Sequence, residues 1–165
     1  ATSSASLRKR LGSTVRCKKM TEDISQSEYN KRFLDRLKIK RPDLLDQVEI
    51  ATHKGVDYVK IEILPPAGQE DAIVISTYGP ELTMFYHAHH AHFDMFADGD
   101  EQDEFDEFFD YIDAFLKEEL VIISEFDGEK WCGSHDARAD ESVEPKENRQ
   151  VIVKSWKGTY SRTIG

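Results

Sequence analysis

The amino-acid sequence predicts an α+β fold in which a mostly antiparallel sheet is packed by an N-terminal helix and a central amphipathic helix. Apolar residues recur at helical spacing over residues 29–37 and again over residues 105–116. Elsewhere apolar and polar side chains alternate, for example over residues 56–64, as expected for strands with one solvated face. The predicted order of elements is a helix, a group of strands, a second helix and further strands, which is typical of an α+β domain.

The chain of 165 residues is long enough for one domain, and its composition changes near Met20. The first 19 residues contain six bases and no acid: Arg8, Lys9, Arg10, Arg16, Lys18 and Lys19. We therefore expect residues 1–20 to be a basic, disordered leader and residues 21–165 to form a single α+β domain. The composition of the leader fits a transit-like peptide, a basic arm or an upstream extension.

The first helix is expected to begin near Ser25 or Ser27, because serine is a favoured N-cap, and to end before Pro42. Its apolar stripe consists of Tyr29, Phe33, Leu34 and Leu37. Six bases make it the positive element of the domain: Lys31, Arg32, Arg36, Lys38, Lys40 and Arg41. These bases either form a solvated face or pair with the acidic helix of a second copy in an oligomer.

Strands are expected on both sides of the central helix in the sequence. Before it, strands are predicted at residues 48–52, 56–64, 72–76 and from Leu82 onward. After it, residues 120–126 lead through the hairpin pair Asp127-Gly128 into residues 130–133. Residues 134–148 are predicted to be a mobile loop, and strands are predicted again at 151–156 and 159–164.

The central helix is the element around which the rest of the chain is expected to pack. Its apolar side chains fall on one stripe: Phe105, Phe108, Phe109, Ile112, Phe115 and Leu116. Burial of these six side chains would contribute roughly 9–18 kcal/mol before the cost of chain entropy. The acids of the same segment lie mostly off the stripe, so one helix buries aromatic rings and presents carboxylates.

The net charge of −10 restricts the partners of the protein. Six of the 22 bases lie in the first 19 residues, so 16 bases face 32 acids in the rest of the chain. Such a surface repels nucleic-acid phosphates and anionic membranes, and it attracts cations or a basic protein. No apolar run approaches the ~18 residues of a membrane span, and two cysteines form no disulfide framework, so a cytoplasmic location is expected.

A run of acids before and along the central helix is the first candidate binding site. The predicted partner-binding residues are Asp98, Asp100, Glu101, Asp103, Asp106, Glu107 and Asp110, with Trp131 and Trp156 as aromatic anchors. The run is not a calcium loop, because the sixth position counted from Asp98 is Asp103 instead of glycine. Two simpler interpretations stay open, namely a solvated helix face for the acids and core packing for the tryptophans.

A second candidate site is the histidine cluster formed by His87, His89, His90 and His92. On an extended strand, His87 and His89 would share one face, and His90 and His92 would share the other. Two such imidazoles can bind one zinc or iron ion, but the remaining ligands must come from elsewhere in the chain. We expect the histidines to form hydrogen bonds within the sheet or to face a partner, without a cofactor; zinc or iron binding is the alternative.

The sequence shows no arrangement competent for catalysis. Its serines lie outside any nucleophile-elbow context, it has no glycine-rich phosphate loop, and Cys132 has no partner that marks a catalytic pair. We therefore predict that the protein is not an enzyme. The alternative functions are a metal-binding protein or metal-dependent hydrolase centred on His87–His92, and a structural or oligomerisation module.

Three segments carry a resemblance to known proteins: FYHAHHAHFDMF, ELVIISEFDGEKWCGS and VKSWKGTYSRTI. With them the chain resembles small bacterial proteins of polymorphic-toxin and contact-dependent-inhibition loci, which are candidate immunity proteins. The doubled His89-His90 departs from the simpler His-x-His-Phe-Asp form expected there. The resemblance implies a cytoplasmic protein that neutralises a toxin by tight binding. An acidic inhibitor suits a basic toxin domain such as a nuclease, because it can mimic phosphate and associate rapidly.

Overall fold

The computed structural model describes residues 24–93, 101–146 and 148–165, and of residues 101–104 it describes the backbone alone. The predicted leader, Asp98 and Asp100 therefore lie outside the described residues. Within them, the predicted α+β architecture is confirmed, with helices, antiparallel strands and a central helix. The strands form two sheets, one of five strands and one of four.

The first helix, α1, spans Gln26–Lys40 and begins at one of the two predicted caps. The Ser25 side chain accepts a hydrogen bond from the backbone N–H of Glu28 at 3.2 Å. Tyr29, Phe33 and Leu37 are buried on its apolar stripe. A 3-10 helix, η2 (Pro42–Gln47), follows at once, since Pro42 cannot continue the α-helix.

The five-stranded sheet contains β1 (Val48–His53), β2 (Val56–Ile63), β3 (Ile73–Ser76), β4 (Leu82–Tyr86) and β5 (His89–Phe93). The strands lie side by side in chain order, and every neighbouring pair is antiparallel. One face buries alternate residues such as Ile61, Ile75 and Met84. The opposite face is open, and Phe85 on it is 44% exposed.

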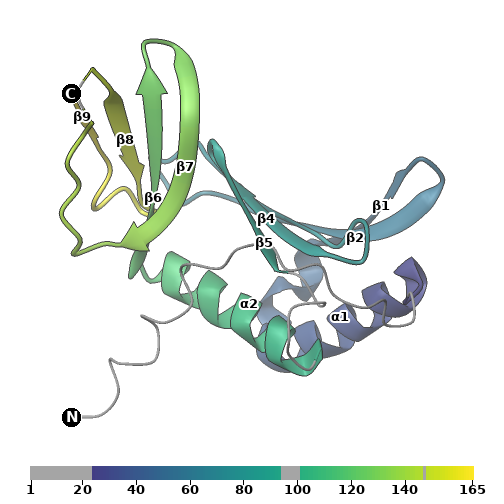
Figure 1. The fold of residues 1–165 in the computed structure, drawn as a ribbon. Coiled ribbons are helices and arrows are strands. Elements are labelled where there is room, and N and C mark those ends of the chain that lie inside the picture. The colour runs from purple at the N-terminus through teal and green to yellow at the C-terminus, as the bar shows by residue number, and fades with distance from the viewer. Residues whose placement is uncertain (1–23, 94–100, 147) are drawn as a thin grey trace.

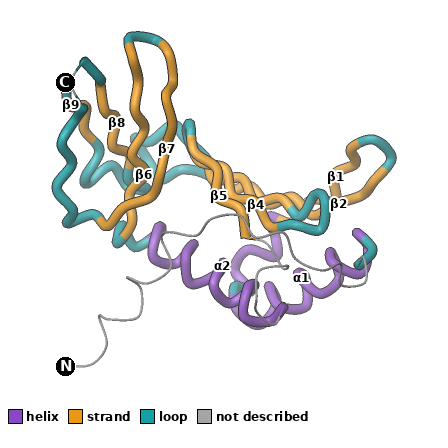
Figure 2. The backbone as a smooth tube through the Cα atoms, viewed as in Figure 1, coloured by secondary structure: helices purple, strands orange, loops and turns teal. Residues whose placement is uncertain are grey.

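The second helix, α2 (Glu101–Leu116), lies beside α1, and together they cover the apolar face of the five-stranded sheet (Figures 1 and 2). Five of the six residues of the predicted stripe are buried, namely Phe105, Phe108, Phe109, Ile112 and Phe115, and the sixth, Leu116, is partly buried against the same core. The ring of Phe33 in α1 stacks on that of Phe109, with the centroids 6.0 Å apart. Neither these helices nor any other helix of the described residues is long and apolar enough to cross a membrane.

The four-stranded sheet has the order β7-β6-β8-β9, formed by β6 (Leu120–Asp127), β7 (Lys130–Arg138), β8 (Gln150–Lys154) and β9 (Arg162–Ile164). It stands beside the first sheet, and its β6–β7 hairpin points away from α2 (Figure 1). Ile122 of β6 belongs to the main core, whereas Val121 and Ile123 pack with Val151 and Val153 in a second, smaller core. Because β6 is buried on both faces, it has an uninterrupted apolar run in the sequence.

Several strand boundaries differ from those predicted: β8 ends at Lys154 instead of residue 156, and β9 begins at Arg162 instead of residue 159. His87 and Ala88 form a turn between β4 and β5, with His87 at a φ of 52°, so the histidine cluster does not lie on one strand. Strand β7 continues to Arg138, so the first five residues of the predicted loop are in fact a strand. These five residues lack the apolar alternation of a strand, because the side chains that face the first sheet and α2 are the polar Ser134 and Asp136.

Candidate functional site

The bases of α1 meet the acids of α2 within one chain. Arg36 donates from Nε to Oδ1 of Asp106 at 2.7 Å and from a terminal nitrogen to Oδ2, and Lys40 Nζ lies 3.3 Å from Oδ1. The hydrogen bonds from Arg36 hold the pKa of Asp106 below its usual range, because they favour the charged carboxylate. Asp106 is therefore part of the helix–helix contact and presents less free charge than its neighbours on α2.

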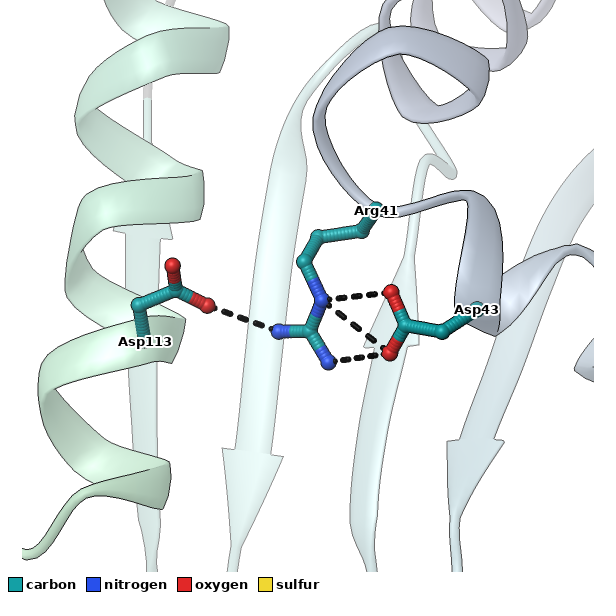
Figure 3. Close-up of polar contacts among 3 residues, drawn as sticks. All are labelled: Arg41, Asp43 and Asp113. Atoms are coloured by element: carbon teal, nitrogen blue, oxygen red, sulfur yellow. Dashed lines mark hydrogen bonds and ion pairs between the residues drawn. The ribbon is translucent and has the colours of Figure 1, made fainter.

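Arg41 makes the second contact between these elements, shown in Figure 3. Its guanidinium donates to Asp113 Oδ1 of α2 at 2.8 Å and to Asp43 Oδ2 of η2 at 2.6 Å. The Arg41 side chain is 15% exposed, whereas the Asp43 and Asp113 side chains are 58% and 44% exposed, so solvent screens these bonds in part. Three of the six bases that could have met the acidic helix of a second copy, Arg36, Lys40 and Arg41, are thus paired with α2 or η2 inside the molecule.

On its other side, α2 borders a groove of about 850 Å³ that extends to the start of β6 and the end of β7. The groove is lined by Asp106, Glu107, Asp110, Tyr111, Ala114, Lys117, Glu118, Glu119, Leu120, Arg138, Ala139, Asp140 and Tyr160. Glu107 and Asp110 are exposed, and neither has an ion-pair partner among the described residues. Six carboxylates against two bases make the groove negative.

Glu118 is the fixed carboxylate of this groove. It follows the C-terminal end of α2 with a φ of 60°, a backbone conformation that glycine usually supplies. Its Oε1 accepts hydrogen bonds from the backbone N–H groups of Lys157 at 2.8 Å and Thr159 at 3.2 Å. Burial opposes its charge, but these hydrogen bonds outweigh burial and lower its pKa. Glu118 therefore joins the end of α2 to the turn that carries Tyr160.

The two tryptophans lie in different environments. Trp156 is 6% exposed, and its ring packs 6.1 Å from Tyr86 and 6.4 Å from Phe115. Core packing is thus confirmed for Trp156, which corrects its assignment as a partner-binding anchor. Trp131 is 47% exposed, as an anchor requires, but it lies near the tip of the β6–β7 hairpin. Seven residues of strand separate it from Arg138, roughly 20 Å, so it does not border the groove.

The predicted acidic site is therefore only partly assembled in the structure. Asp106, Glu107 and Asp110 border the groove, and the side chains of Glu101 and Asp103 lie outside the described residues, as do Asp98 and Asp100. Tyr111, Tyr160 and Arg138 complete the groove and were not predicted. The position of Tyr111, one residue after Asp110, is the only signal for them in the sequence, since Arg138 comes from the end of β7 and Tyr160 from the turn between β8 and β9.

The four clustered histidines point in three directions. His87 lies in the turn, with Nδ1 3.4 Å from Asp71 Oδ2. His89 is buried, with Nδ1 2.9 Å from Ser134 Oγ of β7, and burial lowers its pKa. His90 and His92 point to the open face of the sheet and are exposed. In the part of the chain that the structure describes, no three His, Cys, Asp or Glu side chains converge as ligands for one metal ion.

The contact between the two sheets is polar and was not predicted from the sequence. Ser134 Oγ also lies 3.2 Å from the carbonyl oxygen of Ala88, so one hydroxyl joins β7 to β5. His89 Nε2, Tyr111 Oη and Ser124 Oγ are buried there without hydrogen-bond partners among the described residues. Comparisons of the chain with protein-family models, with curated proteins and with solved structures found no match.

Proposed function

We propose that the protein binds a basic protein partner through the groove beside α2 and acts by occluding that partner. The observation that carries this proposal is the pair Glu107 and Asp110, two exposed carboxylates without ion-pair partners among the described residues, on the rim of a groove of about 850 Å³. The tyrosines Tyr111 and Tyr160 add aromatic surface between the charges. A partner that inserts lysine or arginine side chains would satisfy both features.

The charge of the whole chain supports the same proposal. An acidic surface attracts a basic partner over a distance of several ångströms and increases the rate of encounter, an effect that added salt screens. The apolar and aromatic part of the groove then contributes to the lifetime of the complex. A basic toxin domain is the partner class that the resemblance to immunity proteins implies, and we propose that this protein neutralises such a domain in the cytoplasm.

The experiment that tests this proposal begins with identification of a partner by affinity capture from the native organism. The association rate of the purified partner is then measured with the wild type, with Glu107→Lys/Asp110→Lys and with the control Asp46→Lys/Glu70→Lys. The control changes the net charge by the same amount at two exposed positions outside the groove.

We expect association to slow by about tenfold or more in the groove variant and to change little in the control. About 0.5 M salt should slow the wild type toward the rate of the groove variant. Equal rates for the two variants would show that the total charge, and not the groove, attracts the partner. A captured partner that is acidic would contradict the proposal.

A further inference from the structure

His90 and His92 form a pair on the open face of the five-stranded sheet. Strand β5 pairs with β4 so that His90 lies opposite Phe85 and His92 lies opposite Thr83. Both imidazoles project away from the layer of helices, because Leu82, Met84 and Tyr86 of β4 occupy the buried face. The pair is thus accessible from solvent and is separate from the groove beside α2.

The spacing of the two rings suits a shared metal ion. Their centroids are 4.9 Å apart and their planes are inclined by 82°. With a metal–nitrogen bond of about 2.0–2.1 Å, the centre of an imidazole lies about 3.1 Å from the ion, so two ligands at a tetrahedral angle have centroids about 5 Å apart. The observed separation is close to this value, and small rotations of the exposed side chains would direct one nitrogen of each ring to a common point.

A carboxylate already orients one of the two rings. His92 Nδ1 is in contact with Glu81 Oε1, and Thr83 Oγ1 lies 3.2 Å from the same nitrogen. Since a carboxylate accepts hydrogen bonds, this contact places the proton of the neutral ring on Nδ1 and leaves the lone pair on Nε2. Histidines that bind metals commonly have such a carboxylate behind them, because it fixes the orientation of the ring and raises its basicity.

We propose that His90 and His92 form an open, two-ligand site for a divalent transition ion such as Zn²⁺, with Glu81 as the residue that orients His92. Only two side chains bind the ion, so the absence of a three-ligand cluster among the described residues is compatible with the site. The remaining coordination positions hold water. The site does not depend on the proposed function of the groove, since none of these three residues borders it.

The test is calorimetric titration of ZnCl₂ into tag-free protein that has been stripped with a chelator. The wild type should bind one Zn²⁺ saturably, and His90→Gln and His92→Gln should each abolish that binding. Glu81→Gln should weaken it by about tenfold, the loss typical of a residue that orients a metal ligand. The control variants His53→Gln and His87→Gln remove imidazoles outside the pair, the first exposed and the second half-buried beside Asp71, and should bind as the wild type does.

A second measurement does not depend on how the variants fold. Diethyl pyrocarbonate modifies exposed imidazoles, and mass spectrometry of the wild type should show that Zn²⁺ protects His90 and His92 but leaves His53 modified. The proposal fails if Zn²⁺ protects neither residue of the pair. It also fails if the double variant His90→Gln/His92→Gln is folded by circular dichroism and binds Zn²⁺ as the wild type does.

Discussion

The two sides of α2 use the same kind of residue in opposite ways. Asp106 and Asp113 accept hydrogen bonds from Arg36 and Arg41 on the side that faces α1 and η2, and these contacts hold the helices together, although Asp106 also borders the groove. On the side of the groove, Glu107 lies one residue after Asp106 and is exposed without an ion-pair partner among the described residues. Position on the helix, and not residue type, therefore decides which acids stabilise the fold and which remain free to attract a partner.

One helix can both stabilise the fold and present charge to a partner. The buried aromatic stripe fixes α2 against the sheet, so that the exposed carboxylates keep their positions before a partner arrives. A preorganised surface loses less conformational entropy on binding than a flexible acidic tail does. Changes on the packed side should therefore alter stability, and changes on the groove side should alter association.

The largest effect is expected from the packed side itself. Phe108→Ala should reduce the free energy of unfolding by about 3–5 kcal/mol, because the ring is fully buried between Phe33 and Phe93 and leaves a cavity. Urea denaturation followed by circular dichroism measures this loss. A loss below about 1 kcal/mol would mean that α2 is not packed as described.

A smaller loss of stability is expected at the ion pairs between the helices. Arg41→Met keeps most of the apolar stem but removes the donors to Asp43 and Asp113, and should cost about 1–2 kcal/mol, with allowance for the partial exposure of both carboxylates. A double-mutant cycle with Asp113→Asn measures the coupling across the interface. Additive effects of the two changes would show that the contact in Figure 3 contributes nothing.

An alkaline titration tests the burial of Tyr86 of β4, whose ring packs against Phe115 of α2, without a change in the core. Burial, followed by the charges of Asp71 and Glu118, raises the pKa of Tyr86 from 10.0 to about 12. A raised pKa means that the folded protein resists loss of the phenolic proton, so stability from this group is complete below pH 10 and decreases as the pH rises toward 12. Absorbance at high pH should show one late-titrating phenol fewer in Tyr86→Phe, and an unchanged titration curve would contradict the assignment.

The smallest effect on stability is expected on the groove side. Glu107→Gln/Asp110→Asn should change the free energy of unfolding by no more than about 0.5 kcal/mol, since both side chains are exposed and make no ion pair within the described residues. Thermal unfolding at low and high salt checks this. A marked destabilisation would place these acids among the contacts that maintain the fold.

Much of the fold could be predicted because local pattern and tertiary structure agree in it. The apolar spacing from Phe105 to Phe115 and the alternation in β2 predict which side chains are buried, and Ser25 marks the beginning of α1. The turn at His87 lacks the glycine, proline or asparagine that usually marks a turn, so the sequence gives no warning of it. The last part of β7 is not recognisable in the sequence because it buries the small Ala137 and half-buries the polar Ser134 in place of large apolar residues.

The candidate site could be predicted less well, because it depends on contacts between distant segments. The sequence indicates that α2 is acidic, but not that Arg36 and Arg41 would pair with some of its acids and leave others free. Likewise, the burial of Trp156 depends on the neighbouring rings of Tyr86 and Phe115, whereas Trp131, in a similar local sequence, lies near an exposed hairpin tip. Residue type identified the candidates, and only the tertiary contacts separate them.

The most direct test of the division between the two sides of α2 compares two pairs of neutralising substitutions in one partner-binding assay. Glu107→Gln/Asp110→Asn acts on the groove, and Asp43→Asn/Asp113→Asn removes both partners of Arg41 with the same change in charge. We predict that the first pair slows association at low salt and leaves stability unchanged, whereas the second pair lowers stability and leaves association unchanged. Slower association in both pairs, or in neither, would contradict the account.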